Sequence, residues 1–286
     1  MNHISIKSYA KINLGLDVTG VLDNGYHTVK MIMQNISLYD SLYFEKRSSP
    51  KIILQTNLSY LPTNEKNLVY AAIKLFRETY HISNGVYANV VKKIPVAAGM
   101  AGGSGNAAAT LITLNKLFDK NLSTEELMAL GLKLGADVPY CILGGTALAE
   151  GIGEKLTPIP APPKAKILIV KPGISISTQM VYQNLILDEQ TVHPDIDSTL
   201  AAIKAGSLKD MCASLGNLLE DVSISLHPCI AEIKQQMLDN GAVASLMSGS
   251  GPTVFGIYDD ESAAAKAYDY FKSGEYAAGT FLCDFI

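Results

Sequence analysis

Apolar and polar residues alternate along the first stretch of the chain. Within residues 4–18 the even positions are apolar apart from Ser8, whereas most odd positions are polar. Successive side chains of a strand point to opposite faces, so this alternation predicts one long, half-buried strand. Lys11 and Asn13 then lie two residues apart on its polar face, for which exposure to solvent is the default expectation.

Beyond this strand the apolar pattern changes repeatedly between the two-residue period of strands and the 3.6-residue period of helices. Extended segments are predicted at 28–34, 42–44, 52–55, 86–94, 166–170, 244–246, 254–258 and 280–286, with a hairpin at 146–156. Helices are predicted at 68–76, 106–118, 123–135, 178–187, 198–204, 208–219, 230–240 and 261–271. The helix at 123–135 opens with a capping box, Ser123 to Glu126. Strands and helices therefore alternate in an α+β pattern without an internal repeat.

The sequence indicates one domain boundary. The Pro-rich segment 158–163 (PIPAPP) is the clearest shift of composition in the chain. Proline-rich segments are extended and are typical of linkers. We therefore expect two domains, residues 1–157 and 158–286.

A Gly-rich loop precedes the helix predicted at residues 106–118. Gly99, Gly102, Gly103 and Gly105 leave room for backbone amides to approach an anion, and a helix beginning near Asn106 would direct unpaired N–H groups at the same point. This pattern predicts a phosphate-binding loop, although a flexible linker remains the alternative. It carries no lysine, so it is not a Walker A motif, and its glycine spacing is not that of dinucleotide-binding loops.

Two further stretches carry candidate chemistry. In 135–139 (GADVP) the carboxylate of Asp137 stands between a predicted helix end at Gly135 and a proline that we expect to prevent the helix from resuming. An aspartate in that place is often only a turn or capping residue. The predicted turn 23–25 delivers Tyr26 and His27 to the start of the next strand, where turn packing is the alternative to a binding role.

Composition and charge exclude several classes of protein. The chain has 286 residues, of which 48% are hydrophobic and 17% charged, as in ordinary globular proteins. The formal net charge of -4 and the scattered basic residues argue against nucleic acid as a partner. Its four cysteines form no C-x-x-C pair, so we expect reduced thiols. Since neither a signal peptide nor an apolar run of membrane-spanning length is present, we expect a cytoplasmic protein without membrane contact.

Six motifs run nearly from end to end of the chain. They are 10–14 (AKINL), 24–27 (NGYH), 95–109 (PVAAGMAGGSGNAAA), 135–139 (GADVP), 149–154 (AEGIGE) and 247–251 (MSGSG). In this order they resemble the GHMP small-molecule kinases, and within them the 4-diphosphocytidyl-2-C-methyl-D-erythritol kinases of the non-mevalonate isoprenoid pathway. The resemblance implies a ribosomal-protein-S5-like N-terminal domain and a ferredoxin-like C-terminal domain, with the active site in the cleft between them.

The resemblance also implies a reaction. ATP and Mg²⁺ would be the cosubstrates, and the 2-hydroxyl of a cytidine-diphosphate-linked methylerythritol would be the acceptor, in a monomer or homodimer. A phosphate-binding loop without a lysine needs a cation from elsewhere, which Lys11 can supply. Asp137 would accept the proton of the acceptor hydroxyl or, if the transition state is loose, mainly orient that hydroxyl.

The remaining site residues follow from the same resemblance. Asn13 and Thr178 resemble contacts to methylerythritol, while Tyr26, His27 and Tyr182 resemble a cytosine pocket of stacking rings and a hydrogen-bonding imidazole. The residues that resemble ATP contacts are Asn67, Lys92, Pro95, Gly99, Gly102, Gly103, Ser104, Gly105 and Asn106. Lys92 could equally be a solvated strand end. The metal ligands stay open, since Gly105 stands where family members often carry Ser or Asp.

Two alternatives remain for the function. The chain could be another GHMP kinase, for example one that acts on homoserine or mevalonate, and such an enzyme has no use for a pyrimidine pocket. It could also be a non-catalytic nucleotide-binding member of the fold. The presence of both Lys11 and Asp137 argues against the second alternative.

Overall fold

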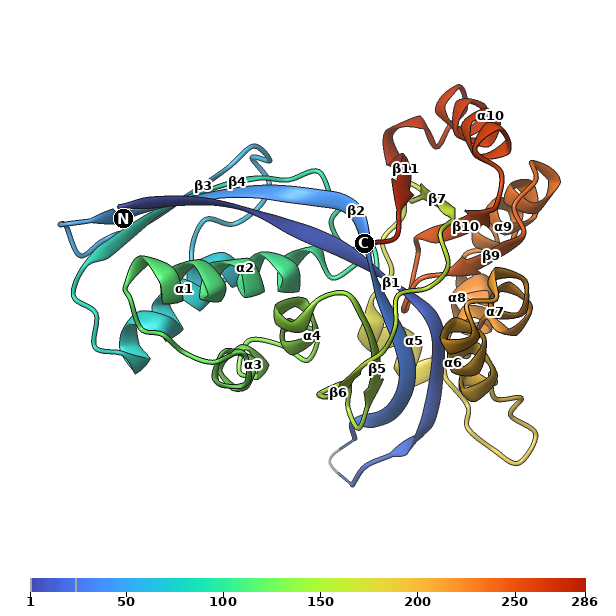
Figure 1. Ribbon diagram of the computed structural model, residues 1–286, viewed down its shortest axis with the longest axis horizontal. Helices are drawn as coiled ribbons and strands as arrows, with labels where there is room; N and C mark the ends of the chain where they lie inside the picture. The colour runs from blue at the N-terminus through green and yellow to red at the C-terminus, as the bar shows by residue number, and fades with distance from the viewer. Residues whose placement is uncertain (1, 24) are drawn as a thin grey trace. The chain divides into compact units, whose positions relative to one another are not determined.

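The computed structural model describes residues 2–23 and 25–286, in which helices and strands alternate (Figure 1). The strands are β1 (His3–Val21), β2 (His27–Arg47), β3 (Ile52–Thr56), β4 (Gly85–Val91), β5 (Thr146–Glu150), β6 (Lys155–Pro158), β7 (Lys166–Val170), β8 (Gly216–Asn217), β9 (Ala244–Met247), β10 (Val254–Tyr258) and β11 (Thr280–Asp284). The helices are α1 (Leu68–Thr79), α2 (Gly102–Leu117), α3 (Thr124–Leu132), α4 (Val138–Leu143), α5 (Thr178–Asn184), α6 (Ile196–Ala205), α7 (Leu208–Ser214), α8 (Glu220–Leu226), α9 (Cys229–Asp239) and α10 (Glu261–Lys272), with the 3₁₀ helix η1 (Ala277–Gly279).

These elements form two compact units. Unit 1 contains residues 2–10, Leu38–Val96 and Ala101–Gly144, and unit 2 contains Lys11–Ser37, Ala97–Met100 and Gly145–Ile286. The long strands β1 and β2 therefore contribute residues to both units. The predicted boundary at residue 158 lies within unit 2 and stays a prediction.

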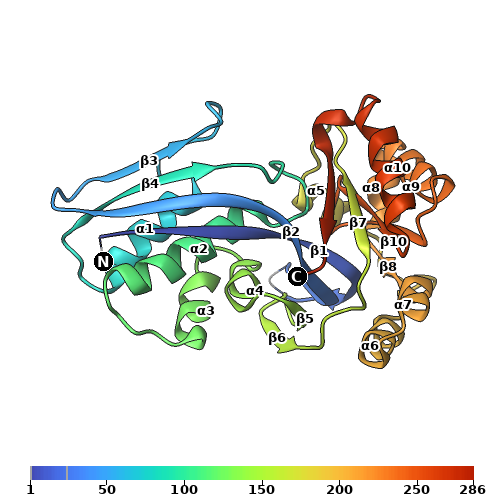
Figure 2. The ribbon, with the colours of Figure 1, turned by 45° about the horizontal axis from the view of Figure 1, so that its top comes forward.

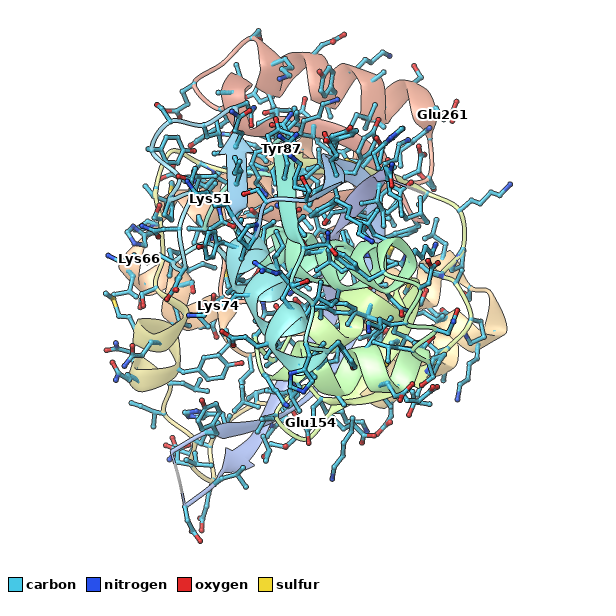
Figure 3. All side chains as sticks on the ribbon, turned by 90° about the vertical axis from the view of Figure 1, so that its left-hand side faces the viewer. Lys51, Lys66, Lys74, Tyr87, Glu154 and Glu261 are labelled. Carbon is cyan, nitrogen blue, oxygen red and sulfur yellow. The ribbon has the colours of Figure 1, made fainter. Side chains whose placement is uncertain are left out.

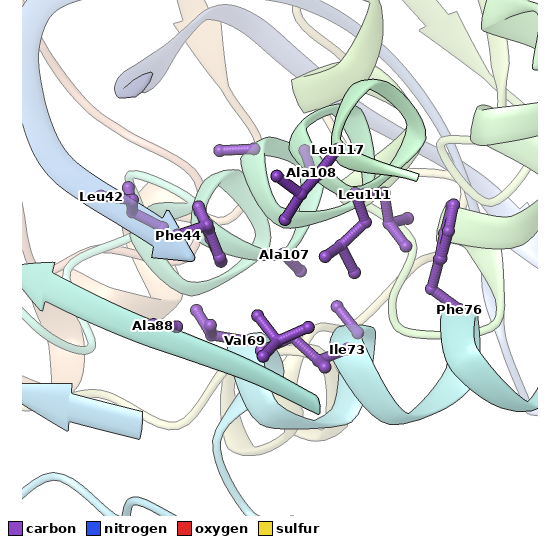
Figure 4. Packing of buried hydrophobic residues seen from close by; sticks show 14 of the residues in the cluster. Leu42, Phe44, Val69, Ile73, Phe76, Ala88, Ala107, Ala108, Leu111 and Leu117 are labelled. Carbon is purple, nitrogen blue, oxygen red and sulfur yellow. The ribbon is translucent and has the colours of Figure 1, made fainter. Parts of the chain in front are cut away.

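Unit 1 is a sheet with helices on one face. Its strand order is β3-β4-β2-β1, in which β3 is parallel to β4 and β4 is antiparallel to β2. Figure 1 shows α1 and α2 along one side of these strands. The core between them contains Phe44 from β2, Phe76 from α1 and Leu111 from α2, all fully buried (Figure 4). The Ala-rich face of α2 lets the helices approach closely, because alanine adds little volume at the contact.

Unit 2 contains an antiparallel sheet of strand order β11-β7-β10-β9. Helices α9 and α10 pack on these strands, as Figure 2 shows. In the same unit β5 pairs with β2 and with β6, and β8 lies parallel to β1. The hairpin predicted at 146–156 is therefore confirmed. In its turn the carboxylate of Glu154, labelled in Figure 3, accepts a hydrogen bond from the N–H of Ile152 at 2.7 Å.

The predicted start of the helix after the Gly-rich loop is wrong by four residues. Helix α2 begins at Gly102 instead of Asn106, after Ala101 in the left-handed conformation (φ 52°). Glycine weakens a helix interior, which is why the sequence favoured a loop at 102–105. In the first turn, however, the helix needs few internal hydrogen bonds, and packing against the rest of unit 1 decides its start.

The proline of the GADVP motif was also misinterpreted. Helix α4 begins at Val138 and has Pro139 in its first turn, where the missing N–H of proline is not needed. The preceding helix α3 ends at Leu132, before Gly135, with the predicted capping box in place at Ser123 and Glu126. Asp137 therefore lies between two helices.

Several predicted bounds were wrong in the remaining chain. The helix predicted at 178–187 ends at Asn184, and the strand predicted at 86–94 ends at Val91. Residues 28–34 and 42–44 belong to one continuous strand, β2, and the helix predicted at 208–219 ends at Ser214. Short helix α8 begins at Glu220, after the two residues of β8. The apolar residues of 215–219 fit a helix period by themselves, but pairing of β8 with β1 takes their backbone into a sheet.

The alternation along β1 correctly predicted a strand and only partly predicted its burial. The odd positions up to Tyr9 are exposed, as expected, but Lys11, Asn13 and Asp17 are buried. Both faces of the strand are thus covered over residues 11–18. In the described part of the chain no helix is long and apolar enough to span a bilayer. Asn24, in the predicted turn before β2, lies outside the described residues.

Candidate active site

Lys11 and Asn13 form the buried polar centre of unit 2. The Lys11 ammonium donates a hydrogen bond to the Asn13 side-chain oxygen at 2.7 Å, and the Asn13 amide lies 3.3 Å from the sulfur of Met31. Lys11 is 5% exposed and Asn13 is fully buried. Their alternation along β1 puts both side chains on one face, as the sequence predicted. In the described residues Asn13 is the one hydrogen-bond partner recorded for the Lys11 ammonium, which has three N–H donors.

A second Gly-rich turn, residues 247–251, lies beside this pair. A Cβ atom built on Gly249, where φ is 59°, would lie 3.5 Å from the Asn13 oxygen and 3.6 Å from the Lys11 ammonium nitrogen. On Gly99 a Cβ atom would lie only 2.3 Å from the Ser248 carbonyl oxygen. The Ser248 hydroxyl in turn donates to the Gly99 carbonyl at 3.1 Å. In this structure Gly99 thus permits close backbone packing within unit 2.

Helix α5 extends this group of residues. The Thr178 hydroxyl is 2.8 Å from the Ser250 hydroxyl of the second Gly-rich turn. Tyr182 lies one helical turn further along the same face of α5, and its ring centre is 4.9 Å from that of His27. These residues of unit 2 form a series in which each member lies next to the following one. The series runs from Lys11 and Asn13 through the second Gly-rich turn and Thr178 to Tyr182 and His27. Tyr26, next to His27, is 61% exposed.

The N-terminus of α2 is the candidate anion site of unit 1. The N–H groups of Gly102, Gly103 and Ser104 belong to the first turn, where a helix has no internal acceptors for them, and Ala101 supplies no capping side chain. The positive end of the helix dipole lies at the same point. This part of the chain therefore retains the anion-binding property that the sequence predicted, now in the first turn of the helix.

Gly105 and Asn106 lie deeper than the first residues of α2. Both are buried, and a Cβ atom on Gly105 would come within 2.6 Å of the Ser8 hydroxyl. The absence of a side chain at Gly105 thus lets α2 pack against β1 in unit 1. The side-chain oxygen of Asn106 has no hydrogen-bond partner in the described part of the molecule. Their predicted contacts to ATP stay predictions.

Lys92 is not a solvated strand end. Its ammonium forms an ion pair with Asp40, and both side chains are almost fully buried. The other oxygen of Asp40 accepts hydrogen bonds from the N–H groups of Lys93 and Ile94, at 2.7 and 2.9 Å. A Cβ atom on Gly102 would lie 3.0 Å from the Lys92 nitrogen, so this cation lies at the N-terminus of α2.

Three other residues of unit 1 that we predicted to bind ATP are Asn67, Gly103 and Pro95. Asn67 caps α1: its side-chain oxygen accepts from the N–H of Val69 at 3.0 Å, and its amide donates to the carbonyl of Pro62 at 2.8 Å. A Cβ atom on Gly103 would lie 3.4 Å from Leu68, so the starts of α1 and α2 are neighbours. Pro95 is half-buried.

Asp137 occupies the residue before α4, in unit 1. Its carboxylate is half-buried and does not cap the helix. Burial raises the pKa of the nearby Tyr140 phenol well above its usual value, and repulsion from the ionised forms of Cys141 and Asp137 raises it further. Tyr140 is therefore a neutral phenol at physiological pH, and Asp137 is the candidate base of this segment.

Sequence reasoning missed some residues that shape these sites. Asp40 lies on the buried face of β2, at a two-residue spacing from Leu38 and Leu42. A charged residue within this apolar alternation is the sequence signal that could have identified Asp40 as a buried charge with a partner. Ser250 was part of a recognised motif but had no assigned role. No local pattern marks Asn217, whose amide hydrogen bonds to the second Gly-rich turn form only in the folded chain.

Comparison with known proteins decides the family. Residues 67–145 match the family described as GHMP kinases N terminal domain, and residues 199–277 match GHMP kinases C terminal. The chain belongs to the GHMP kinase family. This confirms the predicted two-domain GHMP kinase fold, and it makes the chain an ATP-dependent small-molecule kinase.

Relatives and solved structures resemble this GHMP kinase over nearly its whole length. It is 56% identical to the 4-diphosphocytidyl-2-C-methyl-D-erythritol kinase of Lachnoclostridium phytofermentans, over 100% of this chain and 98% of that protein. With the protein of the same name from Lachnospira eligens it shares 48% identity, covering 95% and 94%. The crystal structure of 4-(cytidine 5'-diphospho)-2C-methyl-D-erythritol kinase matches with a TM-score of 0.83 and 31% identity over 99% of both chains.

More distant structures share the fold alone. A homoserine kinase from Cytophaga hutchinsonii matches with a TM-score of 0.79 at 20% identity, covering 99% of this chain and 93% of that one. At this identity the match carries no information about the acceptor. The resemblance to the 4-diphosphocytidyl-2-C-methyl-D-erythritol kinases stated from the sequence motifs is confirmed by the closer relatives.

Proposed function

We propose that this GHMP kinase transfers the γ-phosphoryl group of ATP to the 2-hydroxyl of 4-diphosphocytidyl-2-C-methyl-D-erythritol. The products would be the 2-phosphate and ADP, within non-mevalonate isoprenoid precursor biosynthesis. Support comes from the names of relatives at 56% and 48% identity, which cover nearly the whole chain. We place the reaction in the cytoplasm, in a monomer or homodimer.

The buried Lys11 ammonium is the observation that carries this proposal. It is 5% exposed and donates to Asn13 alone in the described part of the chain, although it has three donors. A buried cation with unused donors is stabilised by an anionic group close by. A transferring phosphoryl group supplies that negative charge, and the ammonium would stabilise the charge that develops on its oxygens.

Asp137 would act on the acceptor hydroxyl. Its carboxylate does not cap α4 and so retains acceptor capacity for a substrate O–H. In a loose transition state the proton leaves the hydroxyl late, so orientation of this hydroxyl by the carboxylate contributes before the proton is taken up. Asn13 and Thr178 would hold the methylerythritol hydroxyls, because Asn13 is hydrogen-bonded to Lys11 and Thr178 is hydrogen-bonded to the second Gly-rich turn.

The cytidine end would bind at His27 and Tyr182. Their rings lie 4.9 Å apart on β2 and α5, and an aromatic face together with an imidazole suits a pyrimidine base. Tyr26 is exposed beside them and would add a second stacking face. This placement puts the base at one end of the series and Lys11 at the other.

ATP would bind with its phosphates at the start of α2. The N–H groups of Gly102, Gly103 and Ser104 in the first turn of α2 suit phosphate oxygens, and the Lys92 ammonium adds positive charge at the same helix end. Gly99, Pro95, Asn67, Gly105 and Asn106 remain proposed contacts on this side. The described residues contain no group of three or more His, Cys, Asp or Glu side chains that could hold a metal. Mg²⁺ would be held by the ATP phosphates, and it would supply positive charge that neutralises them.

The proposal is tested by comparing acceptors and variants. Coupled assays of ATP consumption with the cytidine-linked alcohol, homoserine and mevalonate should show turnover of the first alone. Lys11→Ala should lower kcat about a thousandfold and Asp137→Asn about a hundredfold, because each removes a charged group that acts in the transition state.

Two matched variants serve as controls. Lys166→Ala removes a lysine paired with Asp284 and Glu261, and Asp260→Asn changes the cap of α10. Both should retain wild-type kinetics. Full activity in a folded Lys11→Ala variant would contradict the mechanism.

Tyr182→Ala separates the rival acceptors. If the acceptor carries cytidine, this variant should raise its KM about tenfold and leave the KM for ATP unchanged, because one stacking face is lost. Unchanged kinetics would favour a homoserine or mevalonate kinase. ATP binding without turnover of any acceptor would favour a non-catalytic member of the family.

A further inference from the structure

We propose that Asn217 is a positioning residue of the acceptor site, which holds the second Gly-rich turn (residues 247–251) beside Lys11 and Asn13. The inference rests on the proposed function in so far as Lys11, Asn13 and Thr178 act on the acceptor. Asn217 itself is expected to touch neither substrate.

The Asn217 side chain makes three hydrogen bonds to two segments, and both of its N–H donors are used. Its amide nitrogen donates to the carbonyls of Met247 and Gly249, each at 2.8 Å, and its oxygen accepts from the N–H of Leu219 at 3.0 Å. The residue is 8% exposed, so water does not replace these bonds easily. A buried amide that satisfies two carbonyls at once fixes both peptide groups.

The same residue belongs to a strand that pairs directly with β1. In the short parallel pair, Gly216 is opposite Gly15 and Asn217 is opposite Leu16, and the N–H of Leu218 donates to the Leu16 carbonyl at 2.9 Å. Strand β1 also carries Lys11 and Asn13. Asn217 therefore connects the strand that presents the ammonium with the turn that lies beside it.

Neighbouring side chains of the segment after β8 hold the turn in the same way. Glu220 accepts a hydrogen bond from the N–H of Met247 at 2.8 Å and forms an ion pair with Lys234. The Ser223 hydroxyl donates to the carbonyl of Ser250 at 3.1 Å. The turn is thus fixed from one side by buried polar groups, with Asn217 in contact with two of its carbonyls.

The position of the turn matters because the turn also contacts three residues that we assign to the acceptor site. Gly249 lies against the side chains of Lys11 and Asn13, and Ser250 contacts Thr178. A shift of the turn would therefore change the position of three side chains that we assign to the acceptor. Small misplacements of this kind can lower a rate about a hundredfold.

Asn217→Asp is the sharpest test, because it keeps the shape of the side chain and removes both donors. A carboxylate oxygen would then face two carbonyl oxygens and repel them. In steady-state kinetics we expect kcat to fall about tenfold to a hundredfold and the KM for the acceptor to rise by a larger factor than the KM for ATP. Circular dichroism should show a folded chain.

Asn240→Asp is the matched control. The Asn240 amide donates to Gln236 at the end of α9, and the substitution changes the charge by the same amount. It should leave kcat and both KM values unchanged. Ser223→Ala removes a single hydrogen bond to the turn and should give the same pattern with a smaller loss, about threefold.

The outcomes decide the proposal in either direction. It is overturned if folded Asn217→Asp has wild-type kinetics, or if only kcat falls while both KM values stay unchanged, since a loss of active protein alone would produce that result. Should Asn217→Asp fail to fold, Ser223→Ala decides: a raised acceptor KM supports the proposal and wild-type kinetics overturn it.

A wrong substrate assignment can be distinguished from a wrong role for Asn217, because the wild-type protein tests the substrate by itself. Wild-type protein that turns over homoserine or mevalonate instead of the cytidine-linked alcohol contradicts the proposed substrate. The Asn217 variants are then measured with the acceptor that is turned over, and the same split between the two KM values tests the positioning role.

Discussion

At the scale of single residues, the buried charged groups of this kinase differ in how many partners they have. Asp40 and Lys92 are buried as an ion pair, and Asp40 is further satisfied by two backbone N–H groups. Lys11 is buried to a similar extent, but the hydrogen bond to Asn13 uses only one of its three donors. Because unpaired buried charge is costly, the second arrangement is the one that points to a substrate anion.

Gly99 gives a prediction at this scale. It has φ of 68°, and an added Cβ atom would lie 2.3 Å from the Ser248 carbonyl oxygen. Gly99→Ala should therefore lower the free energy of unfolding by about 2–4 kcal/mol, from left-handed strain and the backbone clash together. The midpoint of urea unfolding measures this loss.

The control for this substitution is Gly173→Ala. Nothing lies within 4 Å of a Cβ atom built on Gly173. Its free energy of unfolding should change by less than about 0.5 kcal/mol, as for an ordinary surface substitution. Equal midpoints for the two variants would contradict the close packing of Gly99.

At the scale of elements, local signals predicted where most helices and strands occur, and tertiary contacts decided several of their ends. The capping box before α3 was read correctly, because Ser123 and Glu126 bond to backbone groups within the same turn. The starts of α2 and α4 were not, since Gly102–Gly105 and Pro139 are poor residues for a helix interior but harmless in a first turn. Strand β8 was missed because it exists only through its pairing with β1.

The capping box gives a prediction for an element. The Ser123 hydroxyl accepts a hydrogen bond from the N–H of Glu126 at 3.2 Å, and the Glu126 carboxylate accepts one from the Ser123 N–H at 2.7 Å. Ser123→Ala should cost about 1 kcal/mol of stability. Thermal unfolding by circular dichroism measures it against Ser59→Ala, which alters an exposed serine in a turn. A change no larger than in Ser59→Ala would show that the cap contributes nothing.

At the scale of the whole molecule, the state of the thiols matters, because the described residues contain no disulfide bond. The four cysteines are Cys141, Cys212, Cys229 and Cys283, and none of them forms a disulfide bond with another described residue. Burial raises the pKa of Cys212 to about 11, and burial also raises that of Cys229.

These thiols give a prediction for the intact chain. At pH 8, three units below the pKa of Cys212, only about one in a thousand of its side chains is thiolate, the form that reacts. Iodoacetamide should leave Cys212 unmodified in the native protein and modify all four cysteines in urea, as mass spectrometry can show. The unfolding temperature should be the same with and without reductant. Rapid alkylation of native Cys212 would contradict its burial.

The amino-acid sequence alone determined the family, the order of most strands and helices, and the residue types available for chemistry. Periodicity, capping signals and glycine patterns each depend on residues close together in the sequence, and the order of motifs can be found from the sequence without a structure. Tertiary structure decided which of those residues meet: it buried both faces of β1 around Lys11 and Asn13, paired Lys92 with Asp40, and brought Asn217 to the second Gly-rich turn. Burial and pairing depend on residues far apart in the chain, and no local pattern contains their distances.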